Sequence, residues 1–458
     1  MASAFLAAHG VNLQQEMTRV QFGEDSEQAL SAVQSPGHQH YVPISRITGV
    51  YLPGRDTNTL WDVTISPGLN EHQTRVIESI EPHQANRLQF QHPSIIDAEG
   101  QFLGPSLCHP HIHLDKAFLL SHPKYADLEI ERGDFAEAMD ITSQAKARFD
   151  DDDLLERGRQ LIKESVSCGV TCMRAFVEVD GSVGLKCLEA GLKLKKEFRE
   201  RCLVQICAFA QLPAFSGDDG GSEVRKLMEE AAEREDVAVL GSTPYVEADE
   251  NRMKENVEWI VELAVKHHKH LDLHLDYFLD AERKPLIWYL LDVLKKRWLS
   301  RAWAGKRIAL GHCTRLTLFE PEEWRHLVDE IGDLPIHFVG LPTSDLFMMG
   351  RPEEEQPCSQ RTRGTLQILE MIQNHGLQGA IGVNNVGNAF TPQGTCDPLS
   401  VASLGVGIYQ AASKQDTDVL YVGLLGLIEA DAGANRGHRN VALRGRNPRL
   451  VLQQDRSL

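Results

Sequence analysis

The feature that most constrains the fold is a regular alternation of short apolar runs and helical patterns after residue 105. Eight runs of strand composition follow one another, at 106–114, 170–179, 203–210, 237–245, 270–276, 307–314, 336–343 and 378–386. The segments between them repeat apolar residues at helical spacing, as at Leu154, Leu161 and Ile162. Eight strand–helix units are the number found in a closed (β/α)8 TIM barrel, so we predict an α/β protein with that fold.

The main competing architecture is an open, doubly wound parallel sheet. Its best sequence marker is a Gly-x-Gly-x-x-Gly turn after the first strand, and no such turn follows the run at 106–114. The absence of this marker favours the closed barrel.

The two ends of the chain have a different texture from the barrel region. Short alternating runs broken by Pro-Gly pairs fill 41–104, and strand-like pieces return near the C-terminus, at 440–443 and 449–452. We therefore predict a small β-sandwich domain built from 41–104 and 431–458, beside a barrel at 105–430. The polar residues 1–40 are expected to form an extension.

Composition and charge limit the class of partner. The hydrophobic fraction of 42% and the charged fraction of 24% are ordinary for a globular protein, and the formal charge of −18 disfavours nucleic acid. The nine cysteines contain no C-x-x-C pair, which is typical of reduced thiols, and no apolar run approaches the roughly 18 residues of a membrane span. We expect a cytoplasmic protein with a small-molecule substrate and no membrane. A homo-oligomer is left open.

Four histidines lie where the predicted strands end. His111 and His113 are two residues apart at the end of the first run, so both face the same side of a strand, about 6 to 7 Å apart. His274 ends the fifth run and His312 the sixth. Because the carboxyl ends of barrel strands meet at the active site, we expect these imidazoles to converge on one divalent metal ion. Zinc and iron both accept such ligands.

Several segments also resemble a known family. The run from Pro110 to Lys116, Pro-His-Ile-His-Leu-Asp-Lys, resembles the first-strand motif of the amidohydrolase superfamily, in its cytosine deaminase-like branch. The segments 208–211, 341–351, 382–386 and 392–395 resemble that branch's third, seventh and eighth strands with their following loops. The similarity extends from about residue 45 towards the C-terminus, and it implies a barrel enzyme that hydrolyses C–N bonds.

The resemblance also implies roles for individual residues. His111, His113 and His274 match the histidines that hold the metal, and His312 matches the histidine that positions the attacking water. Gln211 matches a third-strand glutamine that contacts the substrate.

Two positions depart from the family pattern. Tyr277 stands where the family has the proton-shuttling glutamate, and Asn384 where it has a metal-binding aspartate. A phenol with a pKa of about 10 accepts a proton only as tyrosinate, which a nearby cation would have to stabilise. A neutral amide should also hold the metal more weakly. Asp276 is the nearest remaining carboxylate, two residues from His274 and so expected on the same strand face, although a cap or salt bridge explains it equally well.

The functional hypothesis is a metal-dependent, amidohydrolase-like enzyme that cleaves a C–N bond of a small amide, amidine or heterocycle. Tyr277 or Asp276 would manage the protons. One alternative is a weak or inactive family member that acts as a ligand-binding protein. Another is a metal-assisted lyase or isomerase, for which a tyrosine acid is suited. The histidine pattern favours chemistry, whereas the missing carboxylates argue against the family's own reaction.

Overall fold

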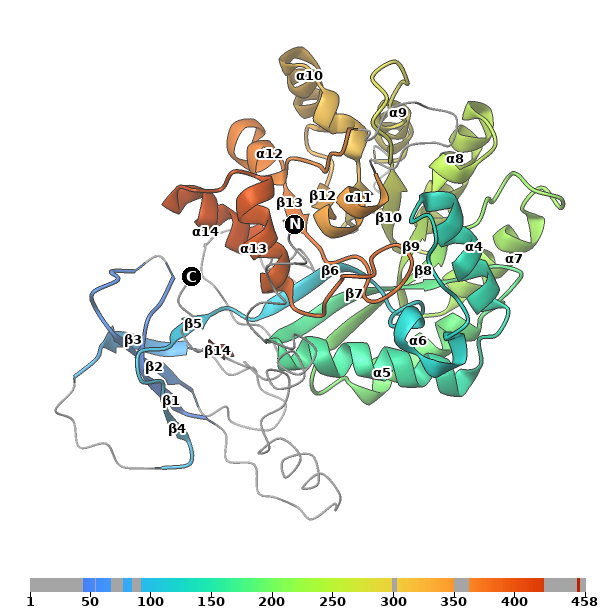
Figure 1. Ribbon diagram of the computed structural model, residues 1–458. Coiled ribbons are helices and arrows are strands. Elements are labelled where there is room, and N and C mark those ends of the chain that lie inside the picture. Colours follow the sequence, from blue (N-terminus) through green and yellow to red (C-terminus); the bar gives the residue numbers. More distant parts are fainter. Residues whose placement is uncertain are drawn as a thin grey trace, which may run out of the picture.

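A computed structural model describes residues 44–53, 55–66, 77–84, 92–298, 303–349, 362–423 and 451–453. The predicted extension at 1–40 lies outside the described residues. The chain forms a large barrel and a smaller sheet beside it (Figure 1).

Eight parallel strands form the barrel, and each of them lies within one of the eight predicted runs. They are β6 (Leu107–His113), β7 (Val170–Glu178), β8 (Leu203–Ala210), β9 (Val237–Ser242), β10 (His270–Leu275), β11 (Ile308–His312), β12 (Ile336–Gly340) and β13 (Gly379–Ile381). A parallel bridge between Ile112 and Asn384 joins the first strand to the segment after the last. The amide N of His113 donates to the Asn384 carbonyl O at 2.8 Å. The (β/α)8 barrel is therefore confirmed.

Helices and short helical turns connect the strands, and the helices lie around the outside of the barrel (Figure 1). The helices are α4 (Phe135–Lys146), α5 (Asp151–Ser167), α6 (Lys186–Glu197), α7 (Ser222–Glu233), α8 (Glu250–Lys266), α9 (Ile287–Trp298), α10 (Pro321–Ile331), α11 (Pro342–Met348), α12 (Ile368–His375), α13 (Pro398–Ile408) and α14 (Lys414–Gly423). The 3-10 turns are η2 (Leu119–Ser121), η3 (Pro123–Tyr125), η4 (Pro244–Val246) and η5 (Thr314–Leu318). None of the described helices is both long and apolar enough to span a membrane.

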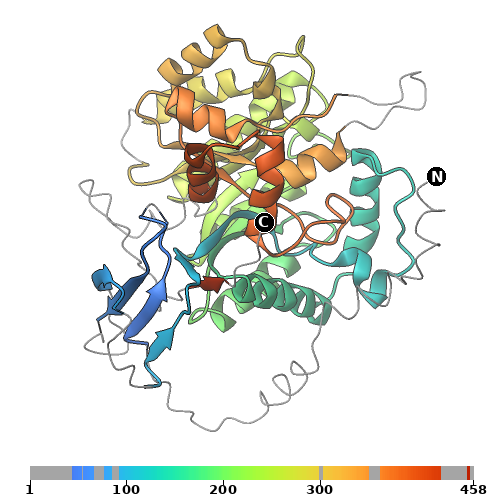
Figure 2. The same cartoon turned by 60° about the vertical axis from the view of Figure 1, so that its left-hand side comes forward.

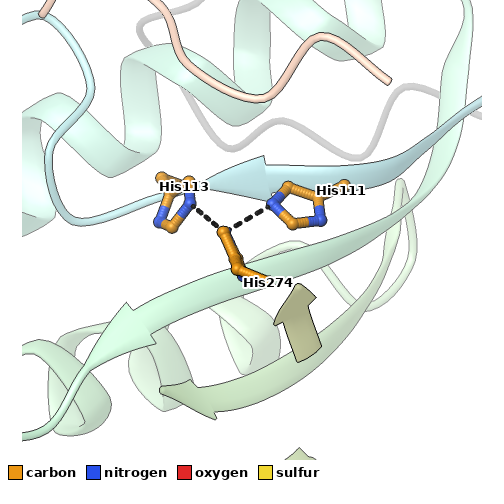
Figure 3. Close-up of side chains that lie close together, drawn as sticks. All are labelled: His111, His113 and His274. Atoms are coloured by element: carbon orange, nitrogen blue, oxygen red, sulfur yellow. Dashed lines mark hydrogen bonds between the residues drawn. The ribbon is translucent and has the colours of Figure 1, made fainter. Parts of the chain in front are cut away.

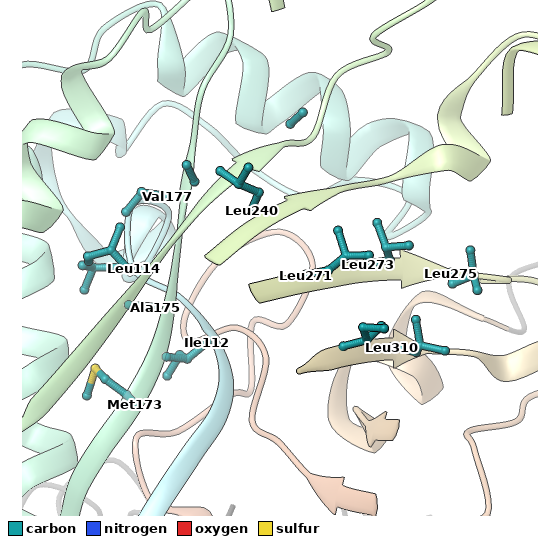
Figure 4. Close-up of a cluster of buried hydrophobic side chains, with 14 of the residues drawn as sticks. Ile112, Leu114, Met173, Ala175, Val177, Leu240, Leu271, Leu273, Leu275 and Leu310 are labelled. Carbon is teal, nitrogen blue, oxygen red and sulfur yellow. The ribbon is translucent and has the colours of Figure 1, made fainter. Parts of the chain in front are cut away.

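The alternation of β6 builds the core and the site together. Ile112 and Leu114 point away from the barrel axis into the main hydrophobic core, where Leu161 and Ile162 of α5 are also buried (Figure 4). His111 and His113 alternate with them and therefore face the barrel interior. One strand thus places two imidazoles inside the barrel while its other face anchors a helix.

A small sheet domain is also confirmed: a four-stranded mixed sheet lies beside a two-stranded sheet that a C-terminal strand completes. The four strands lie in the order β3 (Ile77–Pro82), β2 (Trp61–Ile65), β1 (Arg46–Val50) and β4 (Ile95–Asp97). The strand β5 (Phe102–Gly104) hydrogen-bonds to the end of β1 through Leu103 N and Tyr51 O at 2.8 Å, and β14 (Val451–Gln453) pairs antiparallel with β5 (Figure 2). The predicted piece at 440–443 lies outside the described residues, so the domain boundaries stay predictions.

Candidate active site

Three histidines converge inside the barrel near the carboxyl ends of its strands. His274 Nε2 lies 3.1 Å from His111 Nε2 and 3.2 Å from His113 Nε2 (Figure 3). A divalent ion bound tetrahedrally, about 2.1 Å from each nitrogen, would hold such atoms about 3.4 Å apart. The three side chains are buried, and Nδ1 of each has no hydrogen-bond partner among the described residues. The donor set and its spacing fit a metal ion.

The electrostatic surroundings keep these imidazoles neutral. Burial, together with the nearby side chains of His312, Arg174 and Lys116, holds the pKa of His111 well below its usual range. Burial and repulsion from the neighbouring imidazoles do the same to the pKa of His274. Neutral imidazoles keep a lone pair, and a lone pair is what a metal ligand needs.

Two aromatic rings and a glycine pack against the imidazoles. The ring of Phe176 stacks on His111 with centroids 4.0 Å apart, and Phe209 lies 4.4 Å from the His274 ring. A Cβ at Gly311 would lie 3.1 Å from Cε1 of His111, so a larger residue there would press on that ring. The aromatic rings and the close approach at Gly311 therefore limit how the imidazoles can turn.

A buried carboxylate orients the fourth histidine. His312 ends β11, and its Nδ1 lies 2.7 Å from Oδ1 of Asp345, while Oδ2 of Asp345 accepts from the Thr365 hydroxyl at 2.7 Å. Burial raises the pKa of Asp345. With Nδ1 committed to Asp345, Nε2 of His312 is the ring nitrogen left for the pocket. The sequence analysis missed Asp345, because its position on α11 carries no spacing signal that links it to His312.

One pocket collects most of the predicted site residues. Its lining consists of His113, Lys116, Phe135, Gln211, Tyr245, His274, Tyr277, His312, Ser344, Met348, Asn384, Asn385 and Phe390. The enclosed space measures about 20 Å³, which admits about one water. A ring-sized ligand would therefore require the side chains over the pocket to move.

Tyr277 and Asn384 each present an unpartnered atom to this pocket. The Tyr277 hydroxyl is buried without a partner, and its ring lies 4.2 Å from that of His312. Burial, and then the negative charges of Asp345 and Tyr245, raise the pKa of Tyr277 well above its usual value. In these surroundings the phenol stays protonated, so it can donate a proton but cannot accept one, whereas the sequence analysis considered a tyrosinate. Asn384 Nδ2 donates to the Ser344 hydroxyl at 2.8 Å, which leaves its Oδ1 free.

Asp276 takes the second of the two roles considered for it, that of a cap, and does not replace the lost acid. The strand β10 ends at Leu275, and the backbone of Asp276 has φ of 47°, so the strand alternation no longer sets its direction. Its carboxylate accepts from the backbone N of Leu286 at 2.7 Å and of Ile287 at 3.1 Å, at the start of α9. Asp276 is thus the cap of a helix and does not line the pocket.

A second buried group of charges, also missed from the sequence, lies behind one wall of the pocket. Lys116 Nζ is 2.5 Å from Glu178 Oε1 and 3.4 Å from Gln211 Oε1. Lys146 Nζ is 2.5 Å from Glu178 Oε2 and also pairs with Asp180. Although burial opposes ionisation, Lys116 and Lys146 lower the pKa of Glu178 to about 2. Gln211 therefore lies beside a fixed ammonium group.

Comparison with known proteins supports the same family. No family model matches the chain. The N-isopropylammelide isopropyl amidohydrolase of Pseudomonas sp. (strain ADP) is 22% identical over 339 residues, which cover 71% of this chain and 73% of that protein. The predicted resemblance to the amidohydrolase superfamily is confirmed.

Solved structures share the fold at similar identity. The 5-methylcytosine deaminase of Klebsiella pneumoniae, solved with 5-fluorocytosine, has a TM-score of 0.67 at 22% identity and covers 82% of this chain and 86% of its own. The N-isopropylammelide isopropylaminohydrolase of Burkholderia multivorans has a TM-score of 0.62 at 20% identity, with 83% and 84% covered. These likenesses show that the chain shares the fold of these two proteins.

Proposed function

We propose that the protein is a metal-dependent hydrolase that cleaves a C–N bond of a small heterocyclic, amide or amidine substrate. The observation that carries this proposal is the convergence of His111, His113 and His274, with Nε2 contacts of 3.1 and 3.2 Å. These three residues would hold one divalent ion, zinc or iron, at the pocket that His312 and Tyr277 line. The relatives named above are themselves deaminases and amidohydrolases, which supports the same reaction class.

A divalent ion bound there supplies a Lewis acid, which lowers the pKa of water to about 7 and polarises the carbon under attack. His312 Nε2 then accepts the proton of the attacking water, and Asp345 at 2.7 Å from Nδ1 stabilises the resulting imidazolium. Asn384 Oδ1 adds a neutral oxygen to the site.

The leaving nitrogen needs a proton, and Tyr277 is the group that can donate it. The water oxygen bonds to the substrate carbon, the C–N bond breaks, and the phenol O–H of Tyr277 protonates the departing nitrogen. The imidazolium of His312, whose ring is centred 4.2 Å from that of Tyr277, then returns its proton to the phenolate, which completes the proton balance. Gln211, which lines the same pocket, would contact the substrate. The cycle consumes one water and needs no carboxylate in the pocket.

The test combines metal analysis with ammonia release. Purified protein, loaded with zinc or iron, is incubated with a panel of cyclic amidines, amides and amino-substituted rings, beside His274→Ala. We expect release by the wild type and none by the variant. Binding without turnover would instead favour a ligand-binding protein. Conversion without release of nitrogen would favour a lyase or isomerase.

We also propose a cytoplasmic location and a small-molecule partner. The eight cysteines among the described residues are all free thiols, which supports a reducing compartment. A homo-oligomer stays a prediction.

A further inference from the structure

The fixed charge that lines the pocket is of one sign, positive. Among the thirteen lining residues, Lys116 is the only lysine or arginine, and none is an aspartate or glutamate. Three histidines also line the pocket: His113 and His274 converge with His111, and His312 faces Asp345. Although the whole chain carries a formal charge of −18, the wall that a ligand would meet presents an ammonium group and no carboxylate.

The ammonium group of Lys116 is fixed and has donor capacity to spare. Its side chain is 2% exposed, and Nζ contacts Glu178 at 2.5 Å and Gln211 Oε1 at 3.4 Å. An ammonium carries three N–H donors, so one remains for a ligand. Glu178 is not part of the lining, so its carboxylate lies behind the ammonium as seen from the pocket.

Gln211 supplies a second donor at the same place. Because its Oε1 faces Lys116 Nζ, its amide NH2 is the end left for a ligand. An ammonium and an amide N–H side by side match the two oxygens of a carboxylate, or one ionised oxygen on a ring. The rings of Phe135 and Phe390, 5.8 Å apart, line the same pocket and offer apolar faces to a planar ligand.

The metal ion of the proposed function would add to this excess of positive charge. Its protein ligands would be three neutral imidazoles and an amide oxygen, so none of them neutralises it. In a buried pocket, uncompensated charges attract a counter-charge far more strongly than in water. A bound anion is the simplest source of that charge.

We infer that the ligand of this pocket is a small planar anion whose carboxylate or ionised ring oxygen binds to Lys116 and Gln211. This inference rests on the proposed function and narrows it, since it names the substrate class for the same site. A neutral or cationic amidine would place no negative charge against the pocket side of the Lys116 ammonium, whose partner Glu178 lies outside the lining.

The experiment compares two ligands of nearly equal shape by titration calorimetry. Pyrimidine-5-carboxylate is negatively charged and pyrimidine-5-carboxamide is neutral. We expect the carboxylate to bind at least about tenfold more tightly to the metal-loaded wild type, and to keep a preference after the metal is removed by a chelator. Lys116→Met should reduce the ratio to about threefold or less. Lys124→Met, which removes a partly exposed lysine paired with Asp150, should leave it unchanged.

Several results would overturn the inference. Equal or tighter binding of the carboxamide would do so, and so would failure of the carboxylate to bind. An unchanged ratio in folded Lys116→Met would place the anion on the metal alone. The wild-type comparison needs no variant, so it remains decisive if Lys116→Met does not fold.

Turnover and binding are read separately, which distinguishes the two proposals. If the protein prefers the carboxylate but releases ammonia from no compound, the proposed function is wrong, whereas the inference that the pocket binds a small planar anion stands. Ammonia release from neutral rings, without a preference for the carboxylate, would support the proposed function and overturn the inference about an anionic ligand.

Discussion

Two buried polar clusters lie against the same pocket, and they differ in how completely they are paired. We name them the charged cluster and the open cluster. The charged cluster comprises Lys116, Lys146, Glu178 and Asp180. The open cluster comprises His111, His113, His274, Tyr277 and Asn384.

In the charged cluster every ionised group has an opposite charge beside it. In the open cluster, Nδ1 of the three histidines, the Tyr277 hydroxyl and Asn384 Oδ1 lack partners among the described residues. A buried polar atom without a partner costs about 1–3 kcal/mol. The charged cluster therefore supports the wall, whereas the open cluster holds polar atoms, among them the Tyr277 hydroxyl and Asn384 Oδ1, that the described residues leave unpaired. The following changes test this difference, in order of decreasing effect.

The largest effect is expected from removing a histidine of the open cluster. His274→Ala should lower bound metal from about one ion per chain to almost none, because His274 Nε2 contacts both other imidazoles. The matched control is His326→Ala, since His326 is exposed and stacks on Trp288 at 4.9 Å. Metal analysis of both proteins measures this. Equal metal content would exclude the site.

Tyr277→Phe separates function from stability. Loss of the proton donor should lower kcat by about 10²- to 10⁴-fold. The free energy of unfolding should be unchanged or higher by about 1 kcal/mol, since the hydroxyl that is removed is buried without a partner. Tyr245→Phe, in the same pocket, is the control and should change kcat little. A strongly destabilised Tyr277→Phe would mean that the hydroxyl has a structural partner.

Glu178→Gln, in the charged cluster, should mainly lower stability, whereas Tyr277→Phe should mainly lower kcat. The Glu178→Gln change leaves Lys116 without a counter-charge and Lys146 with Asp180 alone, and it should lower the free energy of unfolding by about 3–5 kcal/mol at pH 7. Because the pKa of Glu178 is lowered to about 2 in the folded state, its stabilising contribution is complete above the unfolded value of about 4.3. It is lost as the pH falls from there towards 2.

Urea unfolding from pH 7 down to the lowest pH at which both proteins fold measures this difference. The gap between wild type and Glu178→Gln should narrow below about pH 4.3. Glu197→Gln is the control, since its partly exposed pair with Arg159 is worth about 1 kcal/mol at most. A gap that does not change with pH would contradict the assigned ionisation.

Asp345 is buried and paired, like the residues of the charged cluster, but its partner is His312, which lines the pocket beside the open cluster. Asp345→Asn should lower kcat by about 10- to 100-fold through misorientation of His312, with KM and metal content unchanged. Thr365→Val, which removes only the bond to Oδ2 of Asp345, should have a smaller effect in the same direction. A parallel loss of bound metal would show that Asp345 supports the barrel as a whole.

The smallest effect is expected from adding charge to the open cluster. Asn384→Asp should tighten metal binding by roughly tenfold, about 1.4 kcal/mol, because a charged oxygen replaces a neutral one. Asn385→Asp is the control, since Asn385 Oδ1 already accepts from Asn388 Nδ2 at 2.7 Å. Competition with a chelator measures both affinities. Unchanged affinity in Asn384→Asp would place Asn384 Oδ1 outside the metal's reach.

The fold could be predicted because each strand and helix leaves a local pattern in the sequence, and the pattern is repeated eight times. Each barrel strand is an apolar run bounded by helical patterns, and the rule that strand ends meet at one face places His111, His113, His274 and His312 together. The same rule failed for Asp276, because β10 stops one residue earlier and the backbone turns. A strand end cannot be placed to one residue from composition.

The supporting residues could not be predicted, since their partners are distant in sequence. Asp345 is 33 residues from His312, and Glu178 is 62 residues from Lys116. No periodicity connects such pairs, and only the closed barrel brings the strand-end loops together. The sequence alone showed that Tyr277 and Asn384 depart from the family pattern. The raised pKa of Tyr277 could not be predicted, because it depends on the burial of the side chain.

The central claim is that the open cluster is the working site of a C–N hydrolase with Tyr277 as its proton donor. The most direct measurement is ammonia release by metal-loaded wild type and Tyr277→Phe, side by side, at equal metal content and over one panel of amino-substituted rings. The account predicts turnover by the wild type on at least one ring and a loss of about 10²-fold or more in the variant. Equal turnover by both proteins, or none by the wild type on any ring, would contradict it.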